Sequence, residues 1–137
     1  MKDMAKITVD ATRESIAQVA AFVEGELEKL SCPFKTLAQI NIAVDELYSN
    51  IVNYAYGGGQ GQASVTVQSL GENYVSVTFE DSGVPYDPLA KPDPDTTLSA
   101  EERKIGGLGI FIVKKTMDSM EYKYENNKNI LTMVKKW

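Results

Sequence analysis

The chain has 137 residues, with 14 Lys and Arg, 19 Asp and Glu, one Cys and no His. The lack of His excludes a Ser-His-Asp triad, a Cys-His pair and a His-ligated metal site, and a single Cys excludes an internal disulfide. The net charge of −5 argues against a nucleic-acid-binding surface, and no apolar stretch reaches the roughly 20 residues that span a membrane. The length and a start without a signal-peptide pattern predict one cytoplasmic domain over residues 1–137.

Two helices are predicted in the first half of the chain, after a short strand over residues 5–9. The first helix runs to Leu30, with Thr12 as its N-cap. The second begins at Pro33, because proline suits the first turn of a helix, and it ends near Tyr56 before a glycine-rich turn. Apolar residues recur three and four positions apart in both segments, which predicts one core-facing stripe on each helix.

Strands dominate the second half of the chain. Alternating apolar residues predict a hairpin of two strands over residues 64–68 and 75–80. Residues 85–102 hold four of the five prolines and are predicted to form a long loop, whereas Ile110–Met120 is apolar enough for a buried helix. Two last strands flank residues 126–129. The order β-α-α-β-β-loop-α-β-β predicts an α+β protein, a two-layer α/β sandwich whose three helices cover one face of a mixed β-sheet.

The second helix carries the first candidate site. Glu46, Asn50 and Asn53 are four and three residues apart and share one helix face. That face lies on a different side of the helix from the apolar stripe, so spacing alone favours a solvated polar surface. Ile42 on the same side, and two Asn residues inside a helix, weaken that interpretation and leave a functional role open. A carboxylate beside amide oxygens can hold a hydrated Mg²⁺ ion or act as a general base.

Asp81 is the second candidate. Period-two alternation places it on the core-facing side of its strand, where a carboxylate is costly unless a partner satisfies it. Two interpretations are equally supported by the residues alone. Asp81 either caps the turn that Ser82 and Gly83 begin, or accepts a hydrogen bond from the exocyclic amine of a ligand, with Gly83 allowing a flat ring to come close to the backbone.

The third candidate is the glycine run of residues 106–109, which opens the third helix. Glycines at a helix start expose N–H groups, and the helix dipole favours an anion there. The spacing matches neither the Rossmann fingerprint nor the Walker A motif. In isolation the run is a weak signal for an anion site, and a hinge of the lid is the simpler interpretation. The nearby Arg103 and Lys104 either add positive charge to the site or are simply solvated.

These three motifs together resemble those of the histidine-kinase-like ATPase superfamily. Glu46-x-x-x-Asn50 is similar to its N-box, residues 81–88 to its first glycine box and residues 105–113 to its second. The resemblance covers nearly the whole chain and is closest to the bacterial anti-sigma-factor serine/threonine-protein kinase branch. It implies a Bergerat-type fold that binds nucleotide between the helical layer and a mobile lid over about residues 88–105.

The resemblance also implies roles for individual residues. Asn50 would hold Mg²⁺ on the phosphates, Glu46 would activate the attacking hydroxyl as the catalytic base, and Asp81 would bind the adenine amino group. The other nucleotide-contacting positions that it implies are Asn53, Gly83, Tyr86, Arg103, Gly106, Gly107, Leu108, Gly109 and Thr132. Tyr54 stands where many relatives have Lys or His. The last strand lacks their paired threonines, so Thr132 or Asn129 is expected near the adenine.

The function implied by this resemblance is that of an anti-sigma regulatory factor. Such a protein uses ATP and Mg²⁺ to phosphorylate a serine or threonine of an anti-sigma-factor antagonist, binds a sigma factor, and is a homodimer. Contacts with nucleic acid or membrane are not expected. The departures at Tyr54 and in the last strand leave an alternative, a nucleotide-gated protein-binding module without kinase activity. A chain without His cannot phosphorylate a histidine of its own.

Overall fold

The computed structural model describes residues 4–90 and 107–137. In chain order its elements are β1 (Met4–Asp10), α1 (Glu14–Lys29), α2 (Phe34–Asn50), a π-helical turn (Ile51–Ala55), β2 (Gln62–Gly71), β3 (Tyr74–Asp81), a 3₁₀ turn (Pro88–Ala90), α3 (Gly107–Thr116), β4 (Ser119–Glu125) and β5 (Lys128–Lys136). This order is the one predicted from the sequence, and the α+β class is confirmed. Most of the predicted lid, including Arg103 and Gly106, lies outside the described residues.

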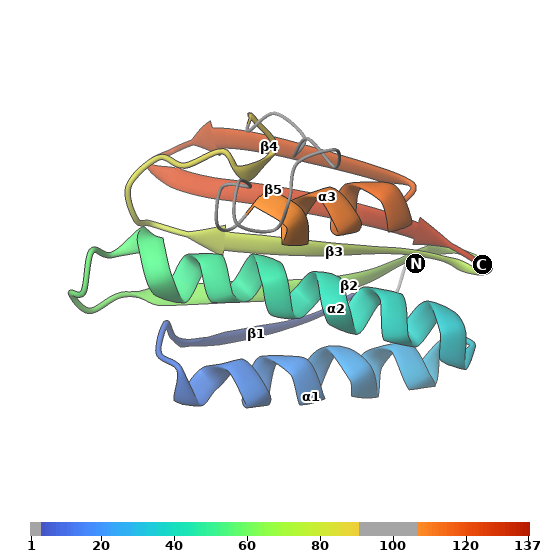
Figure 1. The fold of residues 1–137 in the computed structure, drawn as a ribbon. Coiled ribbons are helices and arrows are strands. Elements are labelled where there is room, and N and C mark those ends of the chain that lie inside the picture. Colours follow the sequence, from blue (N-terminus) through green and yellow to red (C-terminus); the bar gives the residue numbers. More distant parts are fainter. Residues whose placement is uncertain (1–3, 91–106) are drawn as a thin grey trace.

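The five strands form one sheet in the order β1-β2-β3-β5-β4, and the three helices lie together on one of its faces (Figure 1). Every neighbouring pair of strands is antiparallel, so the prediction of a mixed sheet is wrong. The reason lies in the connection that contains α3. This crossover connection makes β4 parallel to β3, but β4 is not the neighbour of β3, because one strand position is left between them. β5 then returns through a tight hairpin into the gap, antiparallel to both neighbours.

The hydrophobic core lies between the sheet and the helices. On the strands it is formed by alternate residues, and Val65, Val67, Val77 and Phe79 are all at most 3% exposed. The predicted stripes of α1 and α2 supply the other half, because Val19, Val23, Leu27, Ile40, Val44 and Leu47 are also at most 3% exposed. The spacing of apolar residues therefore predicted the core-facing side of each of these elements correctly.

The start of α1 differs from the prediction. Arg13 occupies the N-cap position with helical backbone angles and makes no capping hydrogen bond, so Thr12 is not the cap. Instead the Ser15 hydroxyl donates to the Thr12 carbonyl at 2.7 Å and lies 3.3 Å from the Thr12 N–H. A side chain from the first turn thus takes over the local hydrogen bonding that a cap residue normally provides.

Two later boundaries also differ from the prediction. The third helix ends at Thr116, and Met120 already belongs to β4. The last hairpin turns on only two residues, Asn126 and Asn127, whose φ angles of 54° and 61° fit a type I′ turn. Asn129, predicted as part of the turn, therefore lies in β5 opposite Asp81 of β3. This placement matters for the site described below.

Tyr48 joins the two long helices in the core. Its side chain is fully buried, and its hydroxyl lies 2.5 Å from the Ser15 hydroxyl of α1 and 3.5 Å from the Asp10 carbonyl. Burial raises the pKa of the Tyr48 phenol, although the hydrogen bond with Ser15 works in the opposite direction. The phenol therefore remains protonated in the folded protein at pH values where an unfolded tyrosine begins to ionise.

We expect Tyr48→Phe to lower the free energy of unfolding by about 1 kcal/mol near neutral pH, because one buried hydrogen bond is lost. Since the folded-state pKa is raised, the wild-type contribution is complete below about pH 10, the ordinary tyrosine value, and is lost as the pH rises further. The variant should therefore lose less stability between pH 9 and 11 in urea unfolding. Tyr124→Phe, at an exposed position, is the control. If Tyr48→Phe lost as much stability as the wild type between pH 9 and 11, the alkaline loss of stability could not be assigned to Tyr48.

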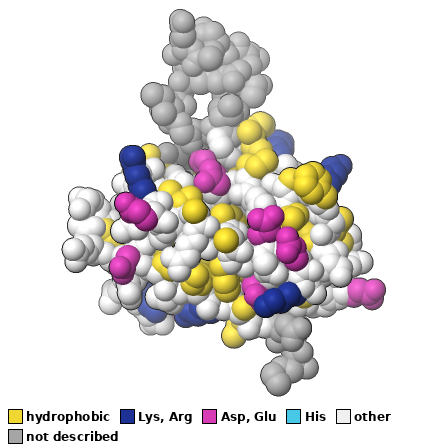
Figure 2. All heavy atoms as spheres, turned by 90° about the horizontal axis from the view of Figure 1, so that it is seen from below, with side chains coloured by type: hydrophobic (Ala, Val, Ile, Leu, Met, Phe, Trp, Pro, Cys, Tyr) yellow, Lys and Arg dark blue, Asp and Glu magenta, His cyan; other side chains and the backbone are white. Residues whose placement is uncertain are grey.

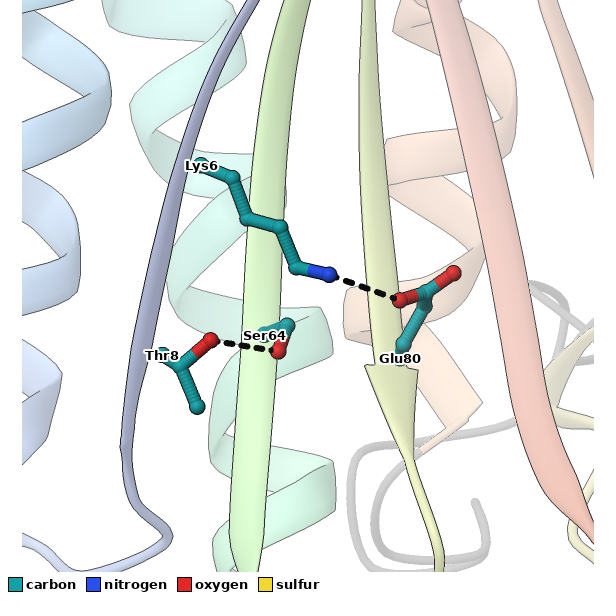
Figure 3. Close-up of polar contacts among 4 residues, drawn as sticks. All are labelled: Lys6, Thr8, Ser64 and Glu80. Carbon is teal, nitrogen blue, oxygen red and sulfur yellow. Dashed lines mark hydrogen bonds and ion pairs between the residues drawn. The ribbon is translucent and has the colours of Figure 1, made fainter.

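The opposite face of the sheet is polar and has no helix over it in Figure 1. The Thr8 hydroxyl lies 2.9 Å from the Ser64 hydroxyl, and Lys6 of β1 reaches across β2 to Glu80 of β3, with a distance of 3.8 Å between the charged groups (Figure 3). An exposed ion pair of this kind contributes at most about 1 kcal/mol. These cross-strand contacts order the polar face but contribute little to stability compared with the core.

Acidic and apolar side chains lie side by side on the surface that α1 forms. Glu24, Glu28, Ala17 and Ala21 are all exposed, and Figure 2 shows carboxylates scattered among apolar groups on this side. The arrangement agrees with the net charge of −5. Within residues 4–90 and 107–137, no helix is long and apolar enough to cross a membrane.

Candidate functional site

A cavity opens between the end of α2 and the strands β3, β5 and β4. About 420 Å³ of space lies in it when its open mouth is counted. Its apolar walls include Leu47, Ile51, Phe79 and Leu131. Its polar side chains are Asn50, Asp81, Tyr86, Tyr122 and Asn129. Apolar walls with a few polar groups are typical of a site for a flat, partly polar ligand.

The π-helical turn after α2 shapes one wall of this cavity. Hydrogen bonds from residue i to i+5 widen the helix at Ile51–Ala55, and the Ala55 carbonyl then accepts a hydrogen bond from the Val84 N–H at 2.8 Å. Tyr56 also connects the end of α2 to the loop after β3. Its hydroxyl lies 2.5 Å from the Gln62 carbonyl and accepts a hydrogen bond from the Ser82 N–H at 2.9 Å. The loop after β3 is therefore held directly against the end of α2.

Gly83 is required at this junction for a reason that differs from the prediction. A Cβ atom at Gly83 would lie 2.0 Å from the Ala55 carbonyl oxygen, and Gly83 is not among the cavity-lining residues. Its missing side chain thus admits the backbone of the π-helical turn, whereas the sequence suggested that it admits the ring of a ligand.

We expect Gly83→Ala to destabilise the protein by about 2 kcal/mol or more, because neither backbone segment can move away without losing the hydrogen bond between Val84 and Ala55. Thermal unfolding should record a fall in Tm of roughly 8 °C. Gly25→Ala in α1 is the matched control, since nothing lies within 4 Å of its added Cβ. It should raise stability by about 0.5–1 kcal/mol, and equal effects of the two substitutions would refute the packing argument.

Asp81 lies at the floor of the cavity with only 6% of its surface exposed. Its Oδ1 atom accepts a hydrogen bond from the Gly83 N–H at 2.9 Å and a second from the Asn129 side-chain amide at 2.9 Å. Asp81 thus both caps the turn and lines the cavity, so the two interpretations of the sequence are compatible. Among the described residues, none donates a hydrogen bond to Oδ2.

Asn129 is the polar residue opposite Asp81 across the β3–β5 pair. Its Nδ2 atom donates to Asp81 and, at 2.9 Å, to the Val84 carbonyl. Its Oδ1 atom accepts from the Tyr86 N–H at 3.0 Å and from the Tyr122 hydroxyl. Burial raises the pKa of the Tyr122 phenol, with a smaller opposing effect of the Tyr86 backbone, and the phenol therefore stays a donor.

The structure separates Thr132 from Asn129, the two residues that the sequence left open near the adenine. Thr132 lies on the opposite face of the sheet, where its hydroxyl is 3.1 Å from that of Thr78. Only Asn129 lines the cavity. The signal that separates them is the alternation of Asn129, Leu131 and Met133 on the core side of β5, and the same alternation would have found Tyr122 on β4.

Glu46 lies next to the start of α3 and is half-buried. A Cβ atom at Gly109 would lie 2.4 Å from the Glu46 carboxyl carbon, so this carboxylate rests directly against the first turn of α3. The positive end of the helix dipole favours a negative charge at this position. Asn50, one turn after Glu46, lines the cavity, which brings the predicted N-box pair and the second glycine box together.

The remaining predicted residues divide into three groups. Asn53 is exposed, because the π-helical turn rotates it away from the face that Glu46 and Asn50 share. Tyr86 lines the cavity, and its ring lies 5.7 Å from that of Tyr54. Gly107 and Leu108 form the start of α3, where only their backbone is described.

The donors around the cavity fit a magnesium ion that is carried with a nucleotide better than one bound by protein alone. Among the described residues, no three His, Cys, Asp or Glu side chains gather closely enough to hold a metal ion. Asn50, which lines the cavity, carries an amide oxygen of the hard donor type that Mg²⁺ prefers. Mg²⁺ commonly uses one or two protein oxygens and completes its shell with phosphates and water.

Comparison with known proteins identifies relatives over most of the chain. The sequence profile of the histidine kinase-like ATPase domain matches residues 9–135. A serine-protein kinase RsbW of Halalkalibacterium halodurans is 31% identical over 134 residues, which cover 95% of this chain and 81% of the relative. An anti-sigma F factor of Clostridium perfringens is 27% identical over 123 residues, covering 90% of this chain and 86% of the relative.

A solved structure supports the fold. The crystal structure of RsbU and RsbW domains from Mycobacterium tuberculosis matches 98% of this chain with a TM-score of 0.70 at 17% sequence identity. The present chain spans about a third of that longer one, 32% of its length. At this identity the likeness shows a common fold alone.

Proposed function

The chain belongs to the histidine kinase-like ATPase domain family, and from this premise we propose that it is an ATP-dependent serine/threonine-protein kinase that acts on an anti-sigma-factor antagonist. The observation that carries the proposal is the buried carboxylate of Asp81 at the floor of a largely apolar cavity. The relatives named as a serine-protein kinase and as an anti-sigma F factor support the choice of activity.

The cavity would bind the adenine base. Ile51, Phe79 and Leu131 offer apolar walls to the faces of the ring, and Oδ2 of Asp81 accepts a hydrogen bond from the exocyclic amino group. A base with a carbonyl at this position would instead place an acceptor against the carboxylate. The site therefore favours adenine over hypoxanthine or guanine.

The N-box pair would serve the phosphates and the transfer. Asn50 would hold Mg²⁺, which neutralises phosphate charge when bound. Glu46 would accept the proton of the attacking serine or threonine hydroxyl as the new oxygen–phosphorus bond forms and the bond between the γ-phosphorus and ADP breaks. The backbone N–H groups of Gly107 and Gly109, in the first turn of α3, would receive the phosphates at the positive end of the helix dipole. Arg103, Gly106 and Leu108 complete the proposed set by resemblance.

The partners follow from the same resemblance. We place a sigma factor and its antagonist protein as the binding partners, in the cytoplasm, with the kinase acting as a homodimer. The acidic and apolar surface around α1 supports a protein partner rather than nucleic acid.

A second candidate is a nucleotide-gated binding module without kinase activity. The observation that favours it is Tyr54, whose ring packs near Tyr86 where many relatives place a cationic or imidazole side chain. Without a cationic or imidazole side chain at position 54, one contact to the phosphates would be missing. This would slow phosphoryl transfer and still permit nucleotide binding.

The test uses the full chain with radiolabelled ATP, Mg²⁺ and purified candidate antagonist proteins. Transfer of label to a serine or threonine supports the kinase. Nucleotide binding by calorimetry without transfer supports the binding module, and absence of ATP and ADP binding refutes both. Co-purification is compared in the presence of ATP and of ADP. A protein that is retained with only one of the two nucleotides is the partner whose affinity the nucleotide controls.

A further inference from the structure

The orientation of the Asn129 amide follows from its neighbours. The Tyr86 backbone N–H can only donate, so the atom 3.0 Å from it must be the carbonyl oxygen of Asn129. The Val84 carbonyl can only accept, so the atom 2.9 Å from it must be the amide nitrogen. The two contacts agree with each other, and together they direct an N–H group of Asn129 to Oδ1 of Asp81.

The hydrogen-bonding capacity of Asn129 is fully used. Its two N–H donors go to Asp81 and Val84, and its oxygen accepts from Tyr86 and Tyr122. Only 7% of the residue is exposed. Asn129 lines the cavity but has no donor or acceptor left with which to contact a base.

The contacts of Asn129 reach three separate elements. They join the end of β3 through Asp81, the following loop through Val84 and Tyr86, and β4 through Tyr122. Within residues 4–90 and 107–137, the Asp81 carboxylate has one other hydrogen-bond partner, the Gly83 N–H on the same loop. Without Asn129 the carboxylate would be held by one of these two hydrogen bonds, and the loop would lose its three hydrogen bonds with the Asn129 side chain, at the Gly83 carbonyl, the Val84 carbonyl and the Tyr86 N–H.

We propose that Asn129 is the positioning residue for base recognition: it fixes Asp81 so that Oδ2 is presented to the exocyclic amine of the ligand. This rests on the proposed nucleotide binding and goes beyond it, because it assigns the selectivity for an amino-substituted base to a residue that does not touch the base. The ligand class is a purine nucleotide with an amino group at the position that Asp81 contacts.

The test is the ratio of affinities for ADP and inosine diphosphate, which carries a carbonyl where ADP carries the amino group. Calorimetry with Mg²⁺ should give a preference for ADP of roughly 10- to 100-fold in the wild-type protein. Asn129→Ala should reduce this preference to about threefold or less, because the carboxylate is then held by one hydrogen bond instead of two. Thr78→Ala, which removes a hydroxyl contact on the opposite face of β3, should keep the wild-type ratio.

The outcomes separate a positioning role from a structural one. A variant that loses affinity for both nucleotides equally, and so keeps the ratio, would overturn the proposal. Failure of the wild-type protein to bind ADP would overturn the proposed function itself, and with it this inference. Wild-type binding of ADP without any preference over inosine diphosphate would overturn only the role of Asp81 and Asn129 in reading the base.

Asn129→Asp provides a second readout with a side chain of the same size. Its new carboxylate replaces an N–H donor beside Asp81, and the repulsion between two carboxylates this close favours the binding of a shared proton as the pH falls. Asp87 adds another negative charge near this corner, which Tyr86, Tyr122 and Tyr124 also face. The preference for ADP should be lost at pH 8 and partly regained near pH 5.5, relative to wild type at each pH. A preference that does not change with pH would count against the proposal.

Discussion

Asp81→Asn is expected to lower the affinity for ATP and ADP by at least about 100-fold, the largest effect of any single substitution on binding. The Gly83 N–H and the Asn129 amide both donate to Oδ1, so the carbonyl oxygen of the variant must take that place. Its NH₂ group then replaces Oδ2 and meets the amino group of adenine, donor against donor. Loss of a charged hydrogen bond and the repulsion together account for the estimate.

The same geometry predicts a reversal of base preference. Inosine diphosphate offers a carbonyl oxygen to the new NH₂ group, so Asp81→Asn should bind it more tightly than ADP. Calorimetry with both nucleotides measures this directly. Asp87→Asn is the matched control, since its carboxylate receives the Leu89 N–H outside the cavity lining. Tight ADP binding retained by Asp81→Asn would show that the base lies elsewhere.

Glu46→Gln is expected to slow phosphoryl transfer by roughly 10²- to 10⁴-fold and to leave ADP affinity within about threefold of wild type. The amide keeps the size of the side chain against Gly109, so the contact between α2 and α3 is preserved. It cannot accept the proton of the attacking hydroxyl, which is the step that the carboxylate is proposed to perform. Transfer of label from ATP to the antagonist protein, at saturating nucleotide, measures the loss.

Asp45→Asn is the control for Glu46→Gln. Asp45 is the next residue on α2, is exposed, and carries the same charge. The control should transfer phosphate at the wild-type rate, which separates the position of the carboxylate from the net charge of the helix. Wild-type transfer by Glu46→Gln would remove Glu46 from the mechanism, and a large loss of ADP affinity would reassign it to binding.

The parts of the candidate site that could be predicted from the sequence are those that depend on local spacing, namely which side chains are buried and which share a helix face. Alternation along β3 placed Asp81 on the buried side, and a buried carboxylate already indicates a partner or a ligand. Helical spacing placed Glu46 and Asn50 on one face. Asn53 was included by the same rule, but it is exposed and does not line the cavity, because helical spacing assumes a regular α-helix and the π-helical turn interrupts it.

The choice between Thr132 and Asn129 was decided by the alternation of side chains along a β-strand and not by the family resemblance. The resemblance left both Thr132 and Asn129 open as the residue near the adenine. The alternation of the last strand separates the two, since Asn129, Leu131 and Met133 are buried and Thr132 contacts Thr78 on the other face. The mixed sheet was also mispredicted, because strand order depends on how β5 pairs and is not encoded in any single segment.

The sequence by itself determined which side of each element faces the core, because helical spacing and strand alternation are local properties of the chain. That was enough to predict the helical layer and the burial of Asp81. Only the tertiary structure decided what the buried groups meet. Asn129 reaches Asp81, Gly83 admits the Ala55 carbonyl, and Glu46 rests on Gly109 through contacts between segments far apart in sequence. Such contacts depend on the packing of whole elements, which no local pattern specifies.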